Sequence, residues 1–85
     1  MNYCVYLLVA IVKKKVISYV GYTKDLDKRI NLHNSSKGAK FTRGKIWQIA
    51  YKKLYKSKIT AMKEEYKLKK NIKLRNKIKT QFKIL

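Results

Sequence analysis

A strong excess of positive charge constrains the fold of this chain more than any other feature. Its 85 residues include 23 Lys and Arg but only 4 Asp and Glu, which gives a net charge of +19. Like charges on a compact chain repel one another unless a polyanion neutralises them. Nucleic acid is therefore the expected partner, because neutralising its phosphates releases bound counterions and drives binding.

Membrane binding and genome composition are the two alternative sources of this charge. An anionic membrane surface also attracts lysines, but no segment combines a strong apolar face with the aromatic anchors of an interfacial helix. An AT-rich genome enriches Lys, Ile, Asn and Tyr, although this bias does not account for the small number of acidic residues. The opening MNYCVYLLVAIV is too short to cross a bilayer and lacks the features of a signal peptide. We therefore expect no membrane association.

The composition fits one small domain over residues 1–85, with a core at 3–70 and a basic tail at 71–85 that is helical or frayed. Apolar residues make up 46% of the chain, enough for a modest core. The single cysteine, Cys4, excludes an intramolecular disulfide, and no cluster of Cys and His indicates structural zinc. We expect a reducing, intracellular location, in the cytoplasm close to the nucleoid.

The apolar pattern predicts three β-strands. They are rich in Val, Ile, Tyr and Leu, as strands usually are, and cover residues 3–12, 16–22 and 46–55. The short polar link at 13–15 predicts that the first two strands form an antiparallel hairpin. Both hairpin strands are apolar on both faces, so at least one of them is expected to lie centrally in a covered sheet.

Two helices are predicted between and after these strands. The first covers residues 24–35, with Thr23 as its N-cap and two aspartates in its first turn. The second covers residues 58–70 and is capped by Ser57. The element order β-β-α-β-α predicts an α/β fold of the α+β type, a small three-stranded antiparallel sheet flanked by helices.

The first predicted helix carries two polar side chains of interest on one side. Arg29 and His33 are four residues apart, so they point in the same direction. His33 lies between Leu26 and Ile30 on one side and Arg29 on the other. From these residues alone, the favoured interpretation is a half-buried histidine that bonds to a backbone carbonyl while Arg29 extends to solvent. A catalytic pair is the alternative.

The second predicted helix directs a carboxylate toward the core. Glu65 lies in the arc between two apolar edges, whereas Glu64 lies nearer the lysine-rich solvent face. The edges consist of Ile59, Met62 and Tyr66 and of Ala61, Leu68 and Ile72. A buried salt bridge, for example to Arg29, and a ligand for a hard cation such as Mg²⁺ are about equally compatible with this spacing.

Taken together, these motifs resemble the GIY-YIG nuclease family. CVY at 4–6 and YVG at 19–21 are similar to the two motifs that give the family its name. An Arg and a His on the next helix, the basic loop SSKGAKFTRG, a strand and a helical Glu follow in the family's order. The likeness extends from residue 3 to about residue 70 and points to the small standalone bacterial members. It is also similar to the nuclease module of Holliday-junction and flap endonucleases. The sequence departs from the motifs at Cys4, where glycine is typical, and at Val20.

The resemblance implies a role for each matching residue. The expected active-site residues are Tyr6 as general base or proton relay, Tyr19 as an organiser of the site, Gly21 as the motif glycine, Arg29 as the stabiliser of the pentavalent phosphate, His33 as the group that polarises the tyrosine or the water, and Glu65 as the ligand of Mg²⁺ or Mn²⁺. A free phenol has a pKa near 10, so neighbouring cations are expected to lower the pKa of Tyr6. The basic loop is expected to bind phosphates through Lys37, Lys40, Arg43 and Lys45.

The function implied by the resemblance is divalent-metal-dependent endonucleolytic hydrolysis of DNA phosphodiester bonds, selective for DNA structure such as branches or flaps, in repair or recombination. The alternative is a non-catalytic, basic nucleic-acid-binding module with the same fold. A weaker rival is a structural polyanion-binding protein that needs only its lysines. Because no recognition helix is appended, we expect shape preference or a partner subunit rather than sequence readout.

Overall fold

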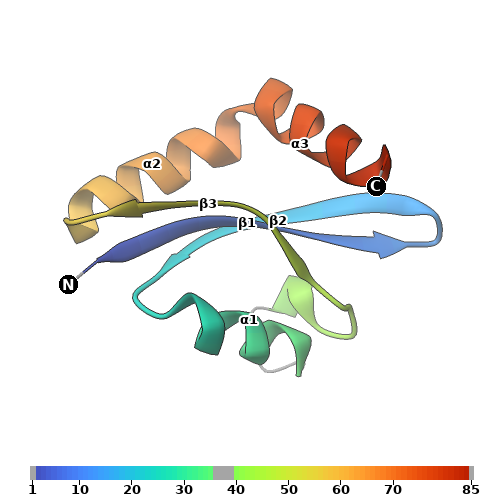
Figure 1. The fold of residues 1–85 in the computed structure, drawn as a ribbon, viewed down its shortest axis with the longest axis horizontal. Helices are drawn as coiled ribbons and strands as arrows, with labels where there is room; N and C mark the ends of the chain where they lie inside the picture. Colours follow the sequence, from blue (N-terminus) through green and yellow to red (C-terminus); the bar gives the residue numbers. More distant parts are fainter. Residues whose placement is uncertain (1, 36–39, 85) are drawn as a thin grey trace.

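A three-stranded antiparallel sheet forms the centre of the protein (Figure 1). The computed structural model describes residues 2–35 and 40–84. The strands are β1 (Tyr3–Val12), β2 (Lys15–Thr23) and β3 (Gln48–Tyr55), and they pair in the order β2-β1-β3. The hydrophobic strand β1 is therefore the central one, as its two apolar faces predicted.

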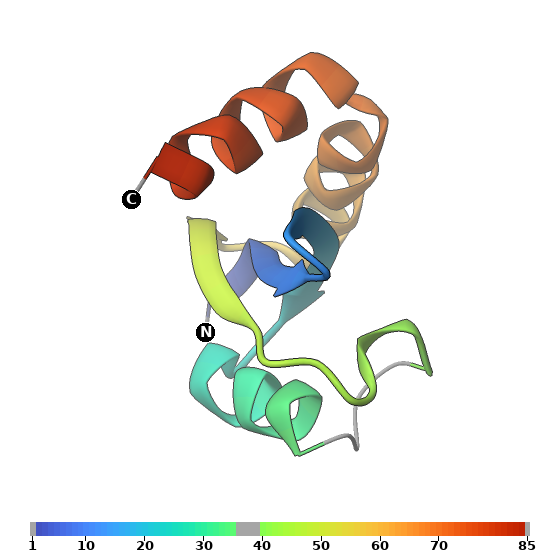
Figure 2. The ribbon, with the colours of Figure 1, turned by 90° about the vertical axis from the view of Figure 1, so that its right-hand side faces the viewer.

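Helices cover both faces of the sheet (Figures 1 and 2). α1 (Leu26–Asn34) lies on one face, while α2 (Lys58–Lys70) and α3 (Ile72–Ile84) lie on the other. A short 3₁₀ turn, η1 (Lys40–Thr42), follows α1. The predicted α+β order is confirmed, and α3 extends it where a helical or frayed tail was expected. Within the part of the chain that the structure describes, no helix has the length and apolar character needed to cross a membrane.

The third helix is part of the packed structure. Leu74, Ile78 and Phe82, spaced four residues apart, pack against the buried residues of the sheet and of α2. This spacing places the three side chains along one side of a helix, where they can cover a flat apolar surface. The basic segment after residue 71 thus contributes to the core rather than extending from it.

The hairpin between β1 and β2 has a tight two-residue turn. Val12 pairs with Lys15, which leaves Lys13 and Lys14 as the turn, with φ angles of 51° and 68°. This left-handed conformation matches the twist of hairpin strands but is usually occupied by Asn or Gly. Two lysines there are strained, and the pairing of nine residues in β1 with β2 holds them in place.

The junction between β2 and α1 differs from the prediction. Asp25, not Thr23, is the N-cap: its carboxylate accepts a hydrogen bond from the backbone N–H of Lys28 at 3.1 Å. Thr23 is the last residue of β2 and is buried, and its hydroxyl accepts from the N–H of Asp25 at 3.2 Å. The strand extends to Thr23 because that residue still pairs with Cys4, so the helix begins two residues later than predicted.

The start of β3 is also later than predicted. Trp47 donates its backbone N–H to Asn34 Oδ1 at 2.6 Å and accepts a bond from Asn34 Nδ2 at 3.2 Å. These bonds direct the backbone of Trp47 toward α1 instead of toward β1, so the strand begins at Gln48. Within it, Leu7 pairs with Tyr51 but Leu8 pairs with Ile49, which makes Ala50 a β-bulge.

The second helix has the predicted bounds but not the predicted burial. Ser57 caps it by accepting from the N–H of Thr60 at 3.4 Å. Ala61 and Leu68 are buried against the sheet, as one predicted edge requires. The other edge, Ile59, Met62 and Tyr66, is exposed, and so is Ile72. One narrow apolar stripe suffices for a helix that lies on a sheet on one side only.

Candidate active site

A cavity of about 470 Å³ opens beside the edge strand β2. It brings together residues from both motif strands, from α1 and from α2, on the two sides of the sheet. Its lining consists of Tyr3, Tyr6, Tyr19, Gly21, Tyr22, Thr23, Lys24, Arg29, Lys58 and Glu65. Five of the six residues predicted as an active site therefore line one cavity. The sixth, His33, does not line it but is hydrogen-bonded to the hydroxyl of Tyr6.

Gly21 makes room for the ring of Tyr6. The two residues are cross-strand partners, so their side-chain directions are the same. A Cβ atom at Gly21 would lie 2.7 Å from Cζ of Tyr6 and closer still to its hydroxyl. Any residue other than glycine would displace the tyrosine. This contact explains why the second motif needs glycine at position 21.

Tyr6, His33 and Thr42 form a buried chain of hydrogen bonds. The Tyr6 hydroxyl lies 3.2 Å from His33 Nε2, and His33 Nδ1 lies 2.8 Å from Thr42 Oγ1. Their exposed fractions are 2%, 1% and 0%. Both ring nitrogens of His33 are thus paired with side chains, and the backbone carbonyl expected as its partner is not used.

Burial sets the protonation of this chain. Loss of solvent raises the pKa of Tyr6 well above its ordinary value, and this effect outweighs the opposite effect of Arg29. Burial, with a further contribution from Arg29, lowers the pKa of His33. The expectation that nearby cations would lower the pKa of Tyr6 is therefore wrong. At neutral pH the structure holds a protonated phenol against a neutral imidazole.

The sequence did not predict the residues that hold His33 on the side of its ring away from Tyr6. Thr42 belongs to η1, and its carbonyl accepts a hydrogen bond from Trp47 Nε1 at 2.9 Å. Trp47 is 1% exposed and bonds through its backbone to Asn34, the neighbour of His33. A lone tryptophan and a threonine within a basic loop are weak signals, because only the folded loop brings them to the histidine.

Glu65 is the acidic residue of the cavity. Its side chain is 17% exposed and pairs with Lys69 at 3.2 Å, so Lys69 takes the place of the expected partner Arg29 in this ion pair. Glu64 is 33% exposed, pairs with Lys67 at 3.4 Å, and faces a separate cavity beneath α3 with Tyr51 and Tyr55. Glu64 is therefore half-buried rather than on the open lysine-rich face, and only its neighbour reaches Tyr6 and Arg29.

The predicted phosphate-binding loop is partly described. Lys40 and Arg43 are exposed in the segment that contains Phe41 and Thr42. Lys45 donates its ammonium group to the carbonyl of Phe41 at 2.8 Å and lies 5.1 Å from the centre of the Phe41 ring. The ammonium group of Lys45 thus binds within its own loop. Lys37, the fourth predicted phosphate-binding residue, lies outside the described residues.

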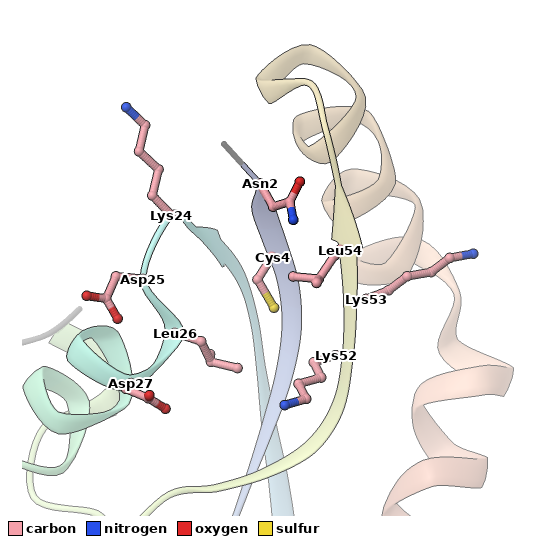
Figure 3. Close-up of a pocket in the computed structure, with 9 residues that line it drawn as sticks. All are labelled: Asn2, Cys4, Lys24, Asp25, Leu26, Asp27, Lys52, Lys53 and Leu54. Carbon is pink, nitrogen blue, oxygen red and sulfur yellow. The ribbon is translucent and has the colours of Figure 1, made fainter.

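A second cavity of about 420 Å³ shows where Cys4 lies (Figure 3). The thiol is located between Leu26 at the start of α1 and Leu54 of β3. Cys4 is buried and lines this cavity, not the one that contains Arg29 and Glu65. Burial raises the pKa of the thiol, so it remains protonated. The cysteine in place of the motif glycine is therefore a packing residue that leaves the candidate site open.

The acidic side chain of the cavity, Glu65, suits a cation that needs few protein ligands. Among the residues that the structure describes, no three His, Cys, Asp or Glu side chains cluster as a metal site. Mg²⁺, however, is commonly bound by one or two carboxylates and several waters, and Glu65 offers a carboxylate at the wall of an open cavity.

Comparison with known proteins places the chain in a family. The sequence model of one family, described as the GIY-YIG catalytic domain, matches residues 2–79. A UPF0213 protein of Oceanobacillus iheyensis is 44% identical over 52 residues, which are 60% of this chain and 60% of the relative. A UPF0213 protein of Halalkalibacterium halodurans is 43% identical over 70 residues, 81% of this chain and 71% of the relative.

A solved structure is also similar. The solution NMR structure of a UPF0213 protein from Bacillus halodurans has a TM-score of 0.50 and 36% identity, and the match covers 91% of this chain and 80% of that one. The matched stretch spans 60% of the Oceanobacillus relative and 53% of a Bacillus pumilus relative, less than two thirds of the length of either.

Proposed function

The chain belongs to the GIY-YIG family, and we propose that it is a divalent-metal-dependent endonuclease that hydrolyses DNA phosphodiester bonds. One observation carries this proposal: Tyr6, Arg29 and Glu65, which come from three different elements, line one open cavity. A proton acceptor, a cation and a carboxylate around a cavity of this size suit hydrolysis of a phosphodiester.

The proposed base is Tyr6 acting through His33. Because the pKa of Tyr6 is raised, the phenol does not ionise in advance at neutral pH. Instead, its oxygen takes a proton from the attacking water while its own proton moves to His33 Nε2, 3.2 Å away. The resulting hydroxide forms the new bond to phosphorus as the bond to the leaving sugar oxygen breaks, and His33 ends as imidazolium.

Charge stabilisation is assigned to Arg29 and Glu65. The guanidinium of Arg29 lies at the cavity wall, where it can bind the non-bridging oxygens as negative charge develops on them. Glu65 would hold the Mg²⁺ or Mn²⁺ ion, which when bound withdraws charge from the phosphate and the leaving oxygen. Lys69, the present partner of Glu65, is exposed enough to move away. Tyr19, 5.2 Å from the ring of His33, keeps that ring in place.

DNA is the proposed substrate because of the charge and its distribution. Lys24 and Lys58 line the cavity itself, and Lys40 and Arg43 extend from the adjoining loop. These groups can neutralise phosphates on both sides of the scissile bond. We propose selectivity for DNA structure, such as flaps or junctions in repair or recombination, with the cytoplasm as the compartment and a partner subunit as a further source of specificity.

The test compares two adjacent carboxylates. Labelled linear, flap and four-way-junction DNA is incubated at low salt with Mg²⁺, Mn²⁺ or EDTA and with the wild type, Glu65→Gln or Glu64→Gln. Each glutamate lies on α2 and pairs with one lysine, but only Glu65 lines the cavity with Tyr6. We expect metal-dependent cleavage that falls by about 100-fold or more in Glu65→Gln and stays near wild type in Glu64→Gln.

Tight DNA binding without cleavage of any substrate would refute the enzyme proposal. It would favour the non-catalytic module instead. Arg29→Ala and Lys28→Ala then separate the remaining possibilities, because both residues are exposed on α1 but only Arg29 lines the cavity. An equal, small loss of binding in both variants would indicate a protein that needs only its overall positive charge.

A further inference from the structure

Thr42 contacts the ring nitrogen of His33 that Tyr6 does not contact. Its hydroxyl oxygen lies 2.8 Å from Nδ1, on the side of the ring opposite Tyr6. A neutral imidazole has one N–H donor and one acceptor nitrogen, and the bond made by one nitrogen decides the state of the other. The hydrogens along the chain Tyr6–His33–Thr42 can therefore be arranged in two ways, with the ring proton of His33 on either Nδ1 or Nε2.

Elementary acid–base chemistry selects one direction. A phenol is a far stronger acid than a neutral imidazole, and an imidazole nitrogen is a better acceptor than a phenol oxygen. The bond between them is thus Tyr6 O–H donating to His33 Nε2. The ring proton must then reside on Nδ1, and in this buried place it needs an acceptor. Thr42 Oγ1 lies 2.8 Å from Nδ1 and can accept this bond.

We infer that Thr42 is a positioning residue, whose hydroxyl oxygen accepts the Nδ1–H of His33 and so holds Nε2 ready to receive the proton of Tyr6. The catalytic consequence rests on the proposed nuclease function, whereas the tautomer itself does not. Without this acceptor, an unconstrained histidine favours the opposite tautomer, in which Nε2 carries the proton. Tyr6 could then no longer pass its proton to His33.

The surrounding structure fixes Thr42 in turn. Its carbonyl is held by the indole N–H of Trp47, whose backbone is bonded twice to the side chain of Asn34. The loop is thus attached to α1 at the residue that follows His33. An uncharged hydroxyl also differs from the carboxylate that often orients a histidine, because it does not favour the imidazolium form. The resting imidazole therefore stays neutral.

A direct test is available because His33 is the single histidine of the chain. Nitrogen-15-labelled histidine gives an NMR spectrum in which long-range correlations identify which ring nitrogen carries the proton. At neutral pH we expect Nδ1–H in the wild type and in Thr42→Ser, and a shift toward Nε2–H in Thr42→Val. The valine side chain has a shape similar to that of threonine but lacks the hydroxyl, and the backbone spectrum reports whether each variant is folded.

Cleavage supplies a second readout. Single-turnover rates at saturating DNA should fall about 10- to 100-fold in Thr42→Val and stay near wild type in Thr42→Ser, with DNA affinity unchanged in both. Nε2–H in the wild type, or an unchanged tautomer and rate in a folded Thr42→Val, would overturn the inference. If the wild type cleaves no DNA, the proposed function fails, and the wild-type tautomer still decides whether Thr42 holds His33 as inferred.

Discussion

The two faces of the central strand β1 differ in chemistry although they are built from alternating residues of the same segment. Toward α2 and α3, the strand presents Val5, Leu7 and Val9, which pack with Val20, Ala61 and Leu68 in a wholly apolar cluster. Toward α1 it presents Cys4, Tyr6, Leu8 and Ala10, and this second cluster is joined to buried His33 and Thr42. One face resembles an ordinary core, and the other contains a chain of polar groups.

The difference shows how a small protein can combine an apolar core on one face of its sheet with buried polar groups on the other. Burying polar groups costs free energy unless each finds a partner, and here the bonds among Tyr6, His33 and Thr42 provide those partners. The apolar face needs no such matching and can supply hydrophobic stabilisation in proportion to its buried area. We therefore expect changes on the first face to affect stability and changes on the second to affect both stability and chemistry.

The largest effect should come from truncating the two adjacent buried leucines. Leu7 and Leu8 are both fully buried but lie on opposite faces. Each change to Ala should lower the free energy of unfolding by about 2–5 kcal/mol, because it removes apolar contacts and leaves a cavity. Urea denaturation in the cold measures this loss.

Cleavage distinguishes the two variants. Measured where both are folded, Leu7→Ala should retain the wild-type single-turnover rate, whereas Leu8→Ala should be slower because Leu8 packs in the cluster of Tyr6 and Trp47. Equal rates in the two variants would show that the faces are not functionally separate.

A medium effect is expected at the glycine beneath Tyr6. Gly21→Ala places a Cβ atom 2.7 Å from the ring carbon Cζ of Tyr6, which forces the ring to move. Overpacking of this kind costs about 1–3 kcal/mol, and the displaced hydroxyl should also slow cleavage. The control is Gly44→Ala, where an added Cβ atom would meet no described group within 4 Å but φ is +74°. It should lose about 1 kcal/mol through backbone strain and keep full activity, as thermal unfolding and cleavage assays can show.

The smallest effect should be the pH dependence of stability caused by His33. Burial lowers its pKa below the ordinary 6.5, so below pH 6.5 the unfolded chain gains a proton that the folded protein resists. The free energy of unfolding should therefore fall as the pH decreases from 6.5 toward the lower, folded pKa. The slope for one proton is at most about 1.4 kcal/mol per pH unit.

His33→Gln provides the reference for this measurement. Its stability should lack the contribution of the histidine while retaining those of all other groups. The difference between wild type and variant in denaturant titrations should thus shrink as the pH falls through 6.5. A difference that grows with acidity would mean that His33 is charged in the folded protein and that the polar face is not arranged as described.

The sequence by itself determined the features that depend on neighbours along the chain. A continuous run of apolar, strand-favouring residues predicted the bounds of β1, and Ser57 with the helical pattern predicted those of α2. The order of the motifs identified the family, and the positions four apart predicted that Arg29 and His33 share one side of α1. Such features arise from local backbone geometry, which a few adjacent residues specify.

Only the tertiary structure decided which groups meet across these elements. The exposure of Ile59, Met62 and Tyr66 depends on α2 having the sheet on one side only, and the continued pairing of Thr23 with β1 moved the cap of α1 to Asp25. The pKa of Tyr6 depends on its burial, which outweighs the charges counted in the sequence. Thr42 reaches His33 because Trp47 and Asn34 fold the loop back. Desolvation and long-range hydrogen bonds belong to the packed molecule and have no signature in a linear pattern.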